Sequence, residues 1–133
     1  MALLVIAASC ASASAQKCLE YGPTVSLAGT LRSQVFPGPP NYESIRRGDR
    51  KERAIILTLV KHTCMSGNDP QGLDVSESNI REMQLVVTET RHWKTVEARL
   101  SKRVVVTGTL FHGFNGHHRT KILVYVSNIR AAA

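Results

Sequence analysis

Residues 83–112 read MQLVVTETRHWKTVEARLSKRVVVTGTLFH, and the change of hydrophobic period along this stretch decides the fold. Apolar residues alternate over residues 83–89, which predicts a strand. The alternation stops over residues 92–101, where apolar side chains recur at the spacing of one helical face. It resumes over residues 103–112, so the stretch predicts a short helix between two strands. The residues predicted to face inward are Met83, Leu85 and Val87 in the first strand and Trp93, Val96 and Leu100 in the helix.

Three further strands are predicted around this unit. Residues 24–36 alternate between apolar and polar, and Gly29 interrupts the apolar positions, which predicts a bulge or a sharp bend. At the start of residues 54–64, the positions that would face either side of a strand are all apolar, which predicts a strand in the centre of a sheet. Residues 121–129 form the last predicted strand, and the GFNG sequence of residues 113–116 supplies the turn before it.

The order strand, strand, strand, helix, strand, strand predicts an all-β fold with one short helix, the OB-like five-stranded barrel. A bend at Gly29 fits this barrel, because the first strand must serve both of its halves. Another small β-barrel, such as an SH3-like one, is the alternative. The polar residues 66–79 predict a long loop between the second and third strands. No apolar run approaches the roughly 18 residues that a membrane-spanning helix needs.

The beginning of the chain predicts export. Residues 1–15, MALLVIAASCASASA, combine a short apolar stretch with an A-x-A-like cleavage site. We therefore expect a signal peptide followed by a single domain at residues 16–133, with lipidation at Cys10 as the alternative. Cleavage leaves Cys18 and Cys64, which we expect to form a disulfide in an oxidising compartment. A metal or redox pair is the other possibility for these cysteines, but no C-x-x-C spacing is present.

Several segments carry a resemblance to known proteins. They are residues 36–45 (FPGPPNYESI), Gly48 with Asp49, residues 102–111 (KRVVVTGTLF) and residues 116–120 (GHHRT). With the two cysteines they span most of the chain after the leader, and they resemble a domain-of-unknown-function family, DUF4431, of small exported bacterial proteins. The resemblance implies an exported, OB-like protein of a Gram-negative bacterium, located in the periplasm or secreted. It implies no activity, because the family label states none.

The charge pattern indicates a binding surface. Lysine and arginine total 17 against 10 acidic residues, and the formal net charge of +7 suits an acidic partner. Prolines stiffen the loop that carries Tyr42, and arginines follow it, which is a composition favoured at interface hot spots. Alternatively, Tyr42 packs over the open end of the barrel as a plug. The candidate binding residues are Tyr42, Arg46, Arg47, Arg50 and Arg53.

We therefore expect a monomeric, non-enzymatic binding protein of the bacterial envelope, without a cofactor, whose partner is an acidic protein, a glycan or a lipid headgroup. No G-x-S-x-G, H-E-x-x-H or phosphate-loop motif supports catalysis, and Glu43, Asp49 and Glu52 are interpreted as counter-charges of the basic loop. Nucleic acid is not an expected partner, because the predicted second and third strands carry no aromatic residue on which bases could stack. A periplasmic inhibitor or immunity protein against a toxin or hydrolase is the alternative function.

The histidines suggest a second alternative, metal binding. A four-residue turn at residues 113–116 would place His112 opposite His117, while His118 would point to the other face of its strand. Two imidazoles on one face bind zinc or copper when a third ligand is available, and His62 is a candidate for that ligand.

Overall fold

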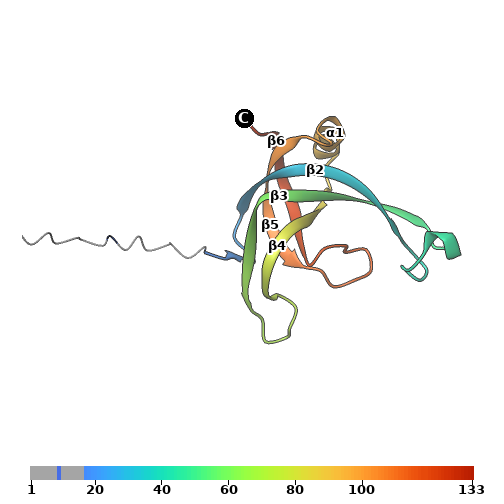
Figure 1. Cartoon of the computed structure of the whole chain (residues 1–133), viewed down its shortest axis with the longest axis horizontal. Helices are drawn as coiled ribbons and strands as arrows, with labels where there is room; N and C mark the ends of the chain where they lie inside the picture. The colour runs from blue at the N-terminus through green and yellow to red at the C-terminus, as the bar shows by residue number, and fades with distance from the viewer. Residues whose placement is uncertain (1–8, 10–16) are drawn as a thin grey trace, which may run out of the picture.

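The computed structural model describes Ser9 and residues 17–133 (Figure 1). The predicted signal peptide at residues 1–15, including Cys10, lies outside the described residues except for Ser9. Within the described residues, no helix is long and apolar enough to cross a membrane. The described elements are β1 (Leu19–Glu20), β2 (Val25–Pro37), η1 (Ile45–Arg47), β3 (Lys51–Asn68), β4 (Val75–Val86), α1 (Thr90–Ala98), β5 (Arg103–His112) and β6 (Ile122–Ala131).

The strands form a closed barrel with one strand outside it. The order in the sheet is β1-β3-β2-β5-β6-β4, and an additional β3–β4 pairing closes β2 to β6 into a ring of five strands. All pairings within the ring are antiparallel except that of β4 with β6, which is parallel. The short β1 lies outside the ring and runs parallel to the end of β3. The prediction of an OB-like barrel is confirmed.

Gly29 lets β2 serve both halves of the barrel. It pairs with Leu59 of β3 and with Val104 of β5, so it stands where β2 passes from one neighbour to the other. A Cβ atom at Gly29 would lie 2.5 Å from the carbonyl oxygen of Thr58, so the close approach of the two strands requires glycine here. Figure 1 shows the resulting long curve of β2 across the molecule. The predicted bend is confirmed.

The core fills the barrel from the inward-facing positions of its strands. Residues 54–57 of β3 are buried without alternation, and β3 pairs with β2 on one edge and with β4 on the other. The central position predicted for this strand is therefore confirmed. Val35, one of the apolar positions in the alternating residues 24–36, is nevertheless 52% exposed near the end of β2. The largest fully buried side chains are Leu31, Ile55, Ile56, Leu57, Met65, Met83, Val96, Val104, Val106, Ile122, Leu123 and Val124.

The helix buries a different face from the one predicted. It begins at Thr90, two residues earlier than expected, and buries His92 together with Val96, while Trp93 is 39% exposed. Leu100 packs against the core from beyond the end of the helix. The spacing of Trp93, Val96 and Leu100 therefore does not describe one helical face, and the prediction of a buried Trp93 is wrong.

The β3–β4 hairpin is longer than expected, and its loop spans only residues 69–74 instead of 66–79. The carboxylate of Asp69 accepts hydrogen bonds from the backbone N–H groups of Gln71, Leu73 and Asp74. These bonds close a compact turn, so the polar residues on both sides of it pair as exposed strand ends.

The predicted disulfide is confirmed. Cys18 and Cys64 are bonded across a sequence separation of 46, with their Cα atoms 4.6 Å apart. The bond ties the segment before β2 to β3, next to the parallel pair that β1 makes with Met65 and Ser66. The N-terminal end of the described domain is thereby fixed to the barrel.

Candidate functional site

Two loops that are distant in the sequence meet on one side of the barrel. They are the β2–β3 loop, residues 38–50, and the β5–β6 loop, residues 113–121, which together are called the two-loop surface below. The hydroxyl of Tyr42 lies 3.2 Å from Nε2 of His117, and the two rings meet edge to face with centroids 5.5 Å apart. A Cβ atom at Gly116 would lie 2.9 Å from the Tyr42 ring, so a larger residue here would displace the ring from this position. Tyr42 is therefore half-buried against the second loop.

Asp49 organises the β2–β3 loop from within. It is 6% exposed, and its carboxylate accepts hydrogen bonds from the backbone N–H groups of Asn41, Glu43 and Ser44 at 2.8–2.9 Å. These bonds favour the charged carboxylate and lower the pKa of Asp49 below its ordinary value. Asp49 is thus a structural residue of the loop, which places Tyr42 and the short helix η1.

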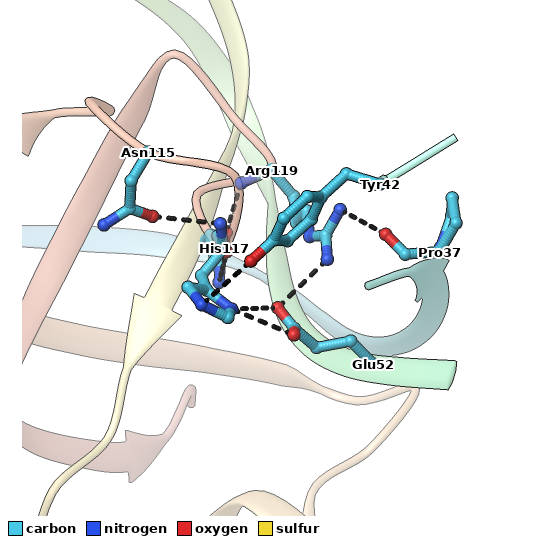
Figure 2. A network of polar contacts seen from close by, with 7 residues as sticks. Pro37, Tyr42, Glu52, Asn115, His117 and Arg119 are labelled. Atoms are coloured by element: carbon cyan, nitrogen blue, oxygen red, sulfur yellow. Dashed lines mark hydrogen bonds and ion pairs between the residues drawn. The ribbon is translucent and has the colours of Figure 1, made fainter. Parts of the chain in front are cut away.

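Arg119 connects the two loops through its guanidinium group. Nη1 donates to the carbonyl oxygen of Pro37 at 2.9 Å, and Nη2 donates to Oε1 of Glu52 at 3.0 Å (Figure 2). The guanidinium carbon lies 5.2 Å from the ring centroid of Phe36 and 5.5 Å from that of Tyr42. The side chain is only 8% exposed, so this arginine holds the site together from beneath.

Glu52, at the start of β3, binds two residues of the β5–β6 loop through its carboxylate. His117 Nδ1 lies 2.8 Å from one oxygen of its carboxylate and 2.9 Å from the other, and Arg119 bonds to the same group (Figure 2). Burial acts to raise the pKa of Glu52, but the hydrogen bonds and charges of His117 and Arg119 outweigh it and hold this pKa below its ordinary value. Glu52 is therefore the negative centre of the network.

Gln84 in β4 anchors the β5–β6 loop from the other side. Its side-chain oxygen accepts a bond from the backbone N–H of Arg119 at 2.6 Å, and its Nε2 donates to the carbonyl of His117 at 3.1 Å. Its own backbone N–H donates to Oγ1 of Thr120. The loop is thus held by β3, β4 and the β2–β3 loop together.

The predicted binding arginines have two different roles. Arg46 and Arg47 in η1 and Arg50 after it are exposed, and within the described residues they make no ion pair. Arg53 lies in β3, where its guanidinium pairs with Glu97 of α1 at 2.7 Å. The two-loop surface therefore carries three of the four predicted arginines, and the fourth links the barrel to the helix.

The predicted register of the histidine hairpin is wrong. His112 pairs with Ile122, and the connection spans residues 113–121 instead of four residues, so His117 lies within the loop and not opposite His112. The β5–β6 pairing ends at the bond from the N–H of Gly113 to the carbonyl of Lys121. Beyond this bond, the chain forms a wider loop. His62 is an exposed residue of β3. In the part of the chain that the structure describes, no group of three or more His, Cys, Asp or Glu side chains is arranged to hold a metal ion.

His112 instead links β5 to β4. Its Nε2 lies 3.0 Å from Oε1 of Glu77, and its Nδ1 lies 2.9 Å from the carbonyl oxygen of Gly113. Burial acts to lower the pKa of His112, but the bonds to Glu77 and Gly113 and the charges of Glu77 and Asp74 outweigh it and raise this pKa. Lys121 adds a longer contact of 3.5 Å to the Glu77 carboxylate.

A groove of about 600 Å³ lies beside the two-loop surface, where β3 and β4 border the end of the β5–β6 loop. Hydroxyl, amide and basic side chains contribute most of its polar lining, and it reaches Arg119 of the loop network. Its lining residues are Thr58, Asn79, Ile80, Arg81, Glu82, Arg119, Thr120 and Lys121.

Sequence reasoning missed the residues that join the loops. Glu52 was interpreted as a counter-charge, and Gln84 and Arg119 were not singled out. A signal was nevertheless present, because the FPGPPNYESI and GHHRT segments that carry the resemblance supply the two sides of this contact.

The comparisons with known proteins give one match. No curated protein and no solved structure matches the chain. Residues 82–130 match a family model described as "Domain of unknown function (DUF4431)". The matched part runs from the end of β4 through α1, β5 and the β5–β6 loop to the end of β6. Residues 82–130 are thus similar to the DUF4431 family, the one that the sequence segments resemble.

Proposed function

We propose that this protein is a non-enzymatic binding protein of the bacterial envelope whose two-loop surface recognises an acidic ligand. One observation carries the proposal: Arg46, Arg47 and Arg50 are exposed on a loop that is locked to a second loop far away in the sequence. Arginines that have no partner of their own within the described residues are available to carboxylate, sulfate or phosphate groups.

The fixed geometry of the loop makes these charges useful for binding. A single exposed ion pair contributes at most about 1 kcal/mol, so an exposed site needs several charges held in place. Asp49 fixes the loop from inside, and the contacts of Tyr42 and Arg119 fix it from outside. Less conformational freedom is then lost when a ligand binds.

The disulfide supports the proposed location. A bond between Cys18 and Cys64 suits an oxidising compartment, such as the periplasm or the medium outside the cell. The leader-like residues 1–15 and the resemblance to exported proteins point to the same place.

The proposal is tested with immobilised heparin as a model acidic ligand. The variant R46Q/R47Q/R50Q removes the three loop charges, and the matched control K94Q/R103Q/R130Q removes three exposed charges from α1, β5 and β6. We expect the loop variant to elute at a clearly lower salt concentration than the control variant. Equal elution of the two variants would show that heparin responds only to net charge, which would refute the proposed surface.

A further inference from the structure

Four rings form a cluster at the surface of the β5–β6 hairpin, called the aromatic cluster below: Phe111, Phe114, His118 and Tyr125. Phe111 stacks on Tyr125 with centroids 4.4 Å apart and an interplanar angle of 28°. Phe114 meets His118 edge to face at 4.5 Å, and Phe111 lies 5.3 Å from the His118 ring. Phe114 is 67% exposed and Tyr125 is 49% exposed. Phe111 and His118 are half-buried, and together with the two exposed rings they form a contiguous aromatic surface, which is a candidate interaction site, unlike a single exposed apolar residue.

The loop holds Phe114 in this exposed position. The backbone N–H of Phe114 donates to Nδ1 of His118 at 3.0 Å, and the N–H of His118 donates to the carbonyl of Asn115 at 3.1 Å. The bond between Gly113 and Lys121 closes the base of the loop. Burial and the neighbouring His117 lower the pKa of His118, so its ring is neutral at pH 7. The cluster is therefore a fixed, uncharged aromatic surface.

The surroundings of Phe114 are polar and carry positive charge. A shallow depression of about 560 Å³ on the β5–β6 loop places Phe114 beside Asn115, His118 and Lys121. Among the described residues, no carboxylate lines this depression, and Lys121, whose long contact of 3.5 Å with Glu77 lies outside it, is 68% exposed. An aromatic face, hydrogen-bonding groups and a cation thus lie together.

We infer that the aromatic cluster and this depression bind a sugar residue of an acidic glycan. The C–H face of the sugar ring stacks on Phe114, and its carboxylate, sulfate or phosphate group faces Lys121. The face of an aromatic ring is electron-rich and attracts the weakly positive C–H groups of a sugar. A depression this open suits a flat ring better than the anchoring side chain of a protein partner, which needs an enclosed pocket.

This inference rests on the proposed function and names the acidic ligand as a glycan. The two surfaces adjoin through neighbouring histidines, because His117 contacts Tyr42 of the arginine loop and His118 contacts Phe114. One glycan chain can therefore use the aromatic cluster and the exposed arginines of the β2–β3 loop together.

The test measures binding to immobilised polygalacturonate, an acidic polysaccharide, with immobilised dextran as the neutral counterpart. We expect binding to polygalacturonate and not to dextran. Phe114→Tyr keeps a flat ring and retains the affinity, whereas Phe114→Leu keeps an apolar side chain but loses the ring and weakens binding roughly fivefold. Trp93→Leu, which removes an exposed aromatic residue of α1, leaves the affinity unchanged. Full affinity in the Phe114→Leu variant would overturn the inference.

Two further results separate this inference from its alternatives. The first is tighter binding to vesicles containing phosphatidylglycerol than to polygalacturonate, together with equal vesicle binding by Phe114→Leu and by the native chain. This result would assign the cluster to a membrane surface and overturn the inference. Weaker polygalacturonate binding by R46Q/R47Q/R50Q but not by Phe114→Leu would leave the proposed function standing and remove the stacking site. The reverse pattern would support the stacking site and remove the arginines from the proposed function.

Discussion

Arg119 shows how one side chain joins distant parts of this chain. Its guanidinium bonds to the carbonyl of Pro37 and to the carboxylate of Glu52, and it also lies over the rings of Phe36 and Tyr42. Lysine would keep the charge but could not form this planar, two-sided contact. The shape of the guanidinium, in addition to its charge, therefore matters here.

We predict that Arg119→Lys lowers the free energy of unfolding by about 1–2 kcal/mol, because buried bonds to Pro37 and Glu52 are lost. Urea unfolding measures the change. Heparin affinity should fall as well, although the net charge is the same, because the β2–β3 loop loses its support. Native stability in this variant would contradict the structural role given to Arg119.

His92 is a polar residue in the core. It is 3% exposed, and neither ring nitrogen has a hydrogen-bond partner among the described residues. Burying a polar group without a partner is unfavourable.

We predict that His92→Leu raises the free energy of unfolding by about 1 kcal/mol or more, because an apolar side chain pays no such desolvation cost. Lys94→Leu, at an exposed position of the same helix, should change the stability by less than about 0.5 kcal/mol and controls for helix propensity. A loss of stability in His92→Leu would show that the imidazole has a favourable role in the core.

At the scale of elements, strands were predictable because alternation records which side of a strand faces the core. The bounds of residues 103–112 agree with those of β5, and Gly29 marked the bend of β2. The face of α1 was not predictable, because Leu100 lies beyond the helix and a histidine occupies the buried position instead of Trp93. The β5–β6 turn was not predictable either, because contacts with β3 and β4 determine its length.

The contact between β4 and β5 through His112 predicts a pH dependence. The pKa of His112 is raised in the folded state, so its interaction with Glu77 stabilises fully below about pH 6.5 and is lost as the pH rises through the folded-state pKa. We predict that His112→Gln lowers the free energy of unfolding by up to about 1 kcal/mol more at pH 5.5 than at pH 8.5. Urea unfolding at both values measures this difference, and an equal or larger loss at pH 8.5 would contradict the assignment.

At the scale of the whole molecule, the disulfide fixes the N-terminal segment to the barrel. Its loop of 46 residues gives a stabilisation of about 4 kcal/mol in the chain-entropy model. We predict that C18S/C64S lowers the free energy of unfolding by roughly this amount, which denaturant unfolding measures. A loss below about 1 kcal/mol would mean that the barrel alone determines the stability.

The candidate site was predictable only in part, because it is assembled from separate segments of the chain. Tyr42 and the arginines could be singled out from local composition, since prolines and basic residues surround them. Their support could not, because Glu52, Gln84 and Arg119 meet only after the barrel closes. Sequence alone thus indicated which groups could bind a ligand, while the fold explains how they are held.

The central claim is that the arginines of the two-loop surface bind an acidic ligand, and the salt dependence of heparin affinity tests it most directly. Each charge contact with a polyanion releases counterions, so the affinity falls with rising salt in proportion to the number of contacts. We predict a smaller salt dependence for R46Q/R47Q/R50Q than for K94Q/R103Q/R130Q, with the largest loss of affinity at low salt. An affinity that does not vary with salt, or the same salt dependence in both variants, would contradict the claim.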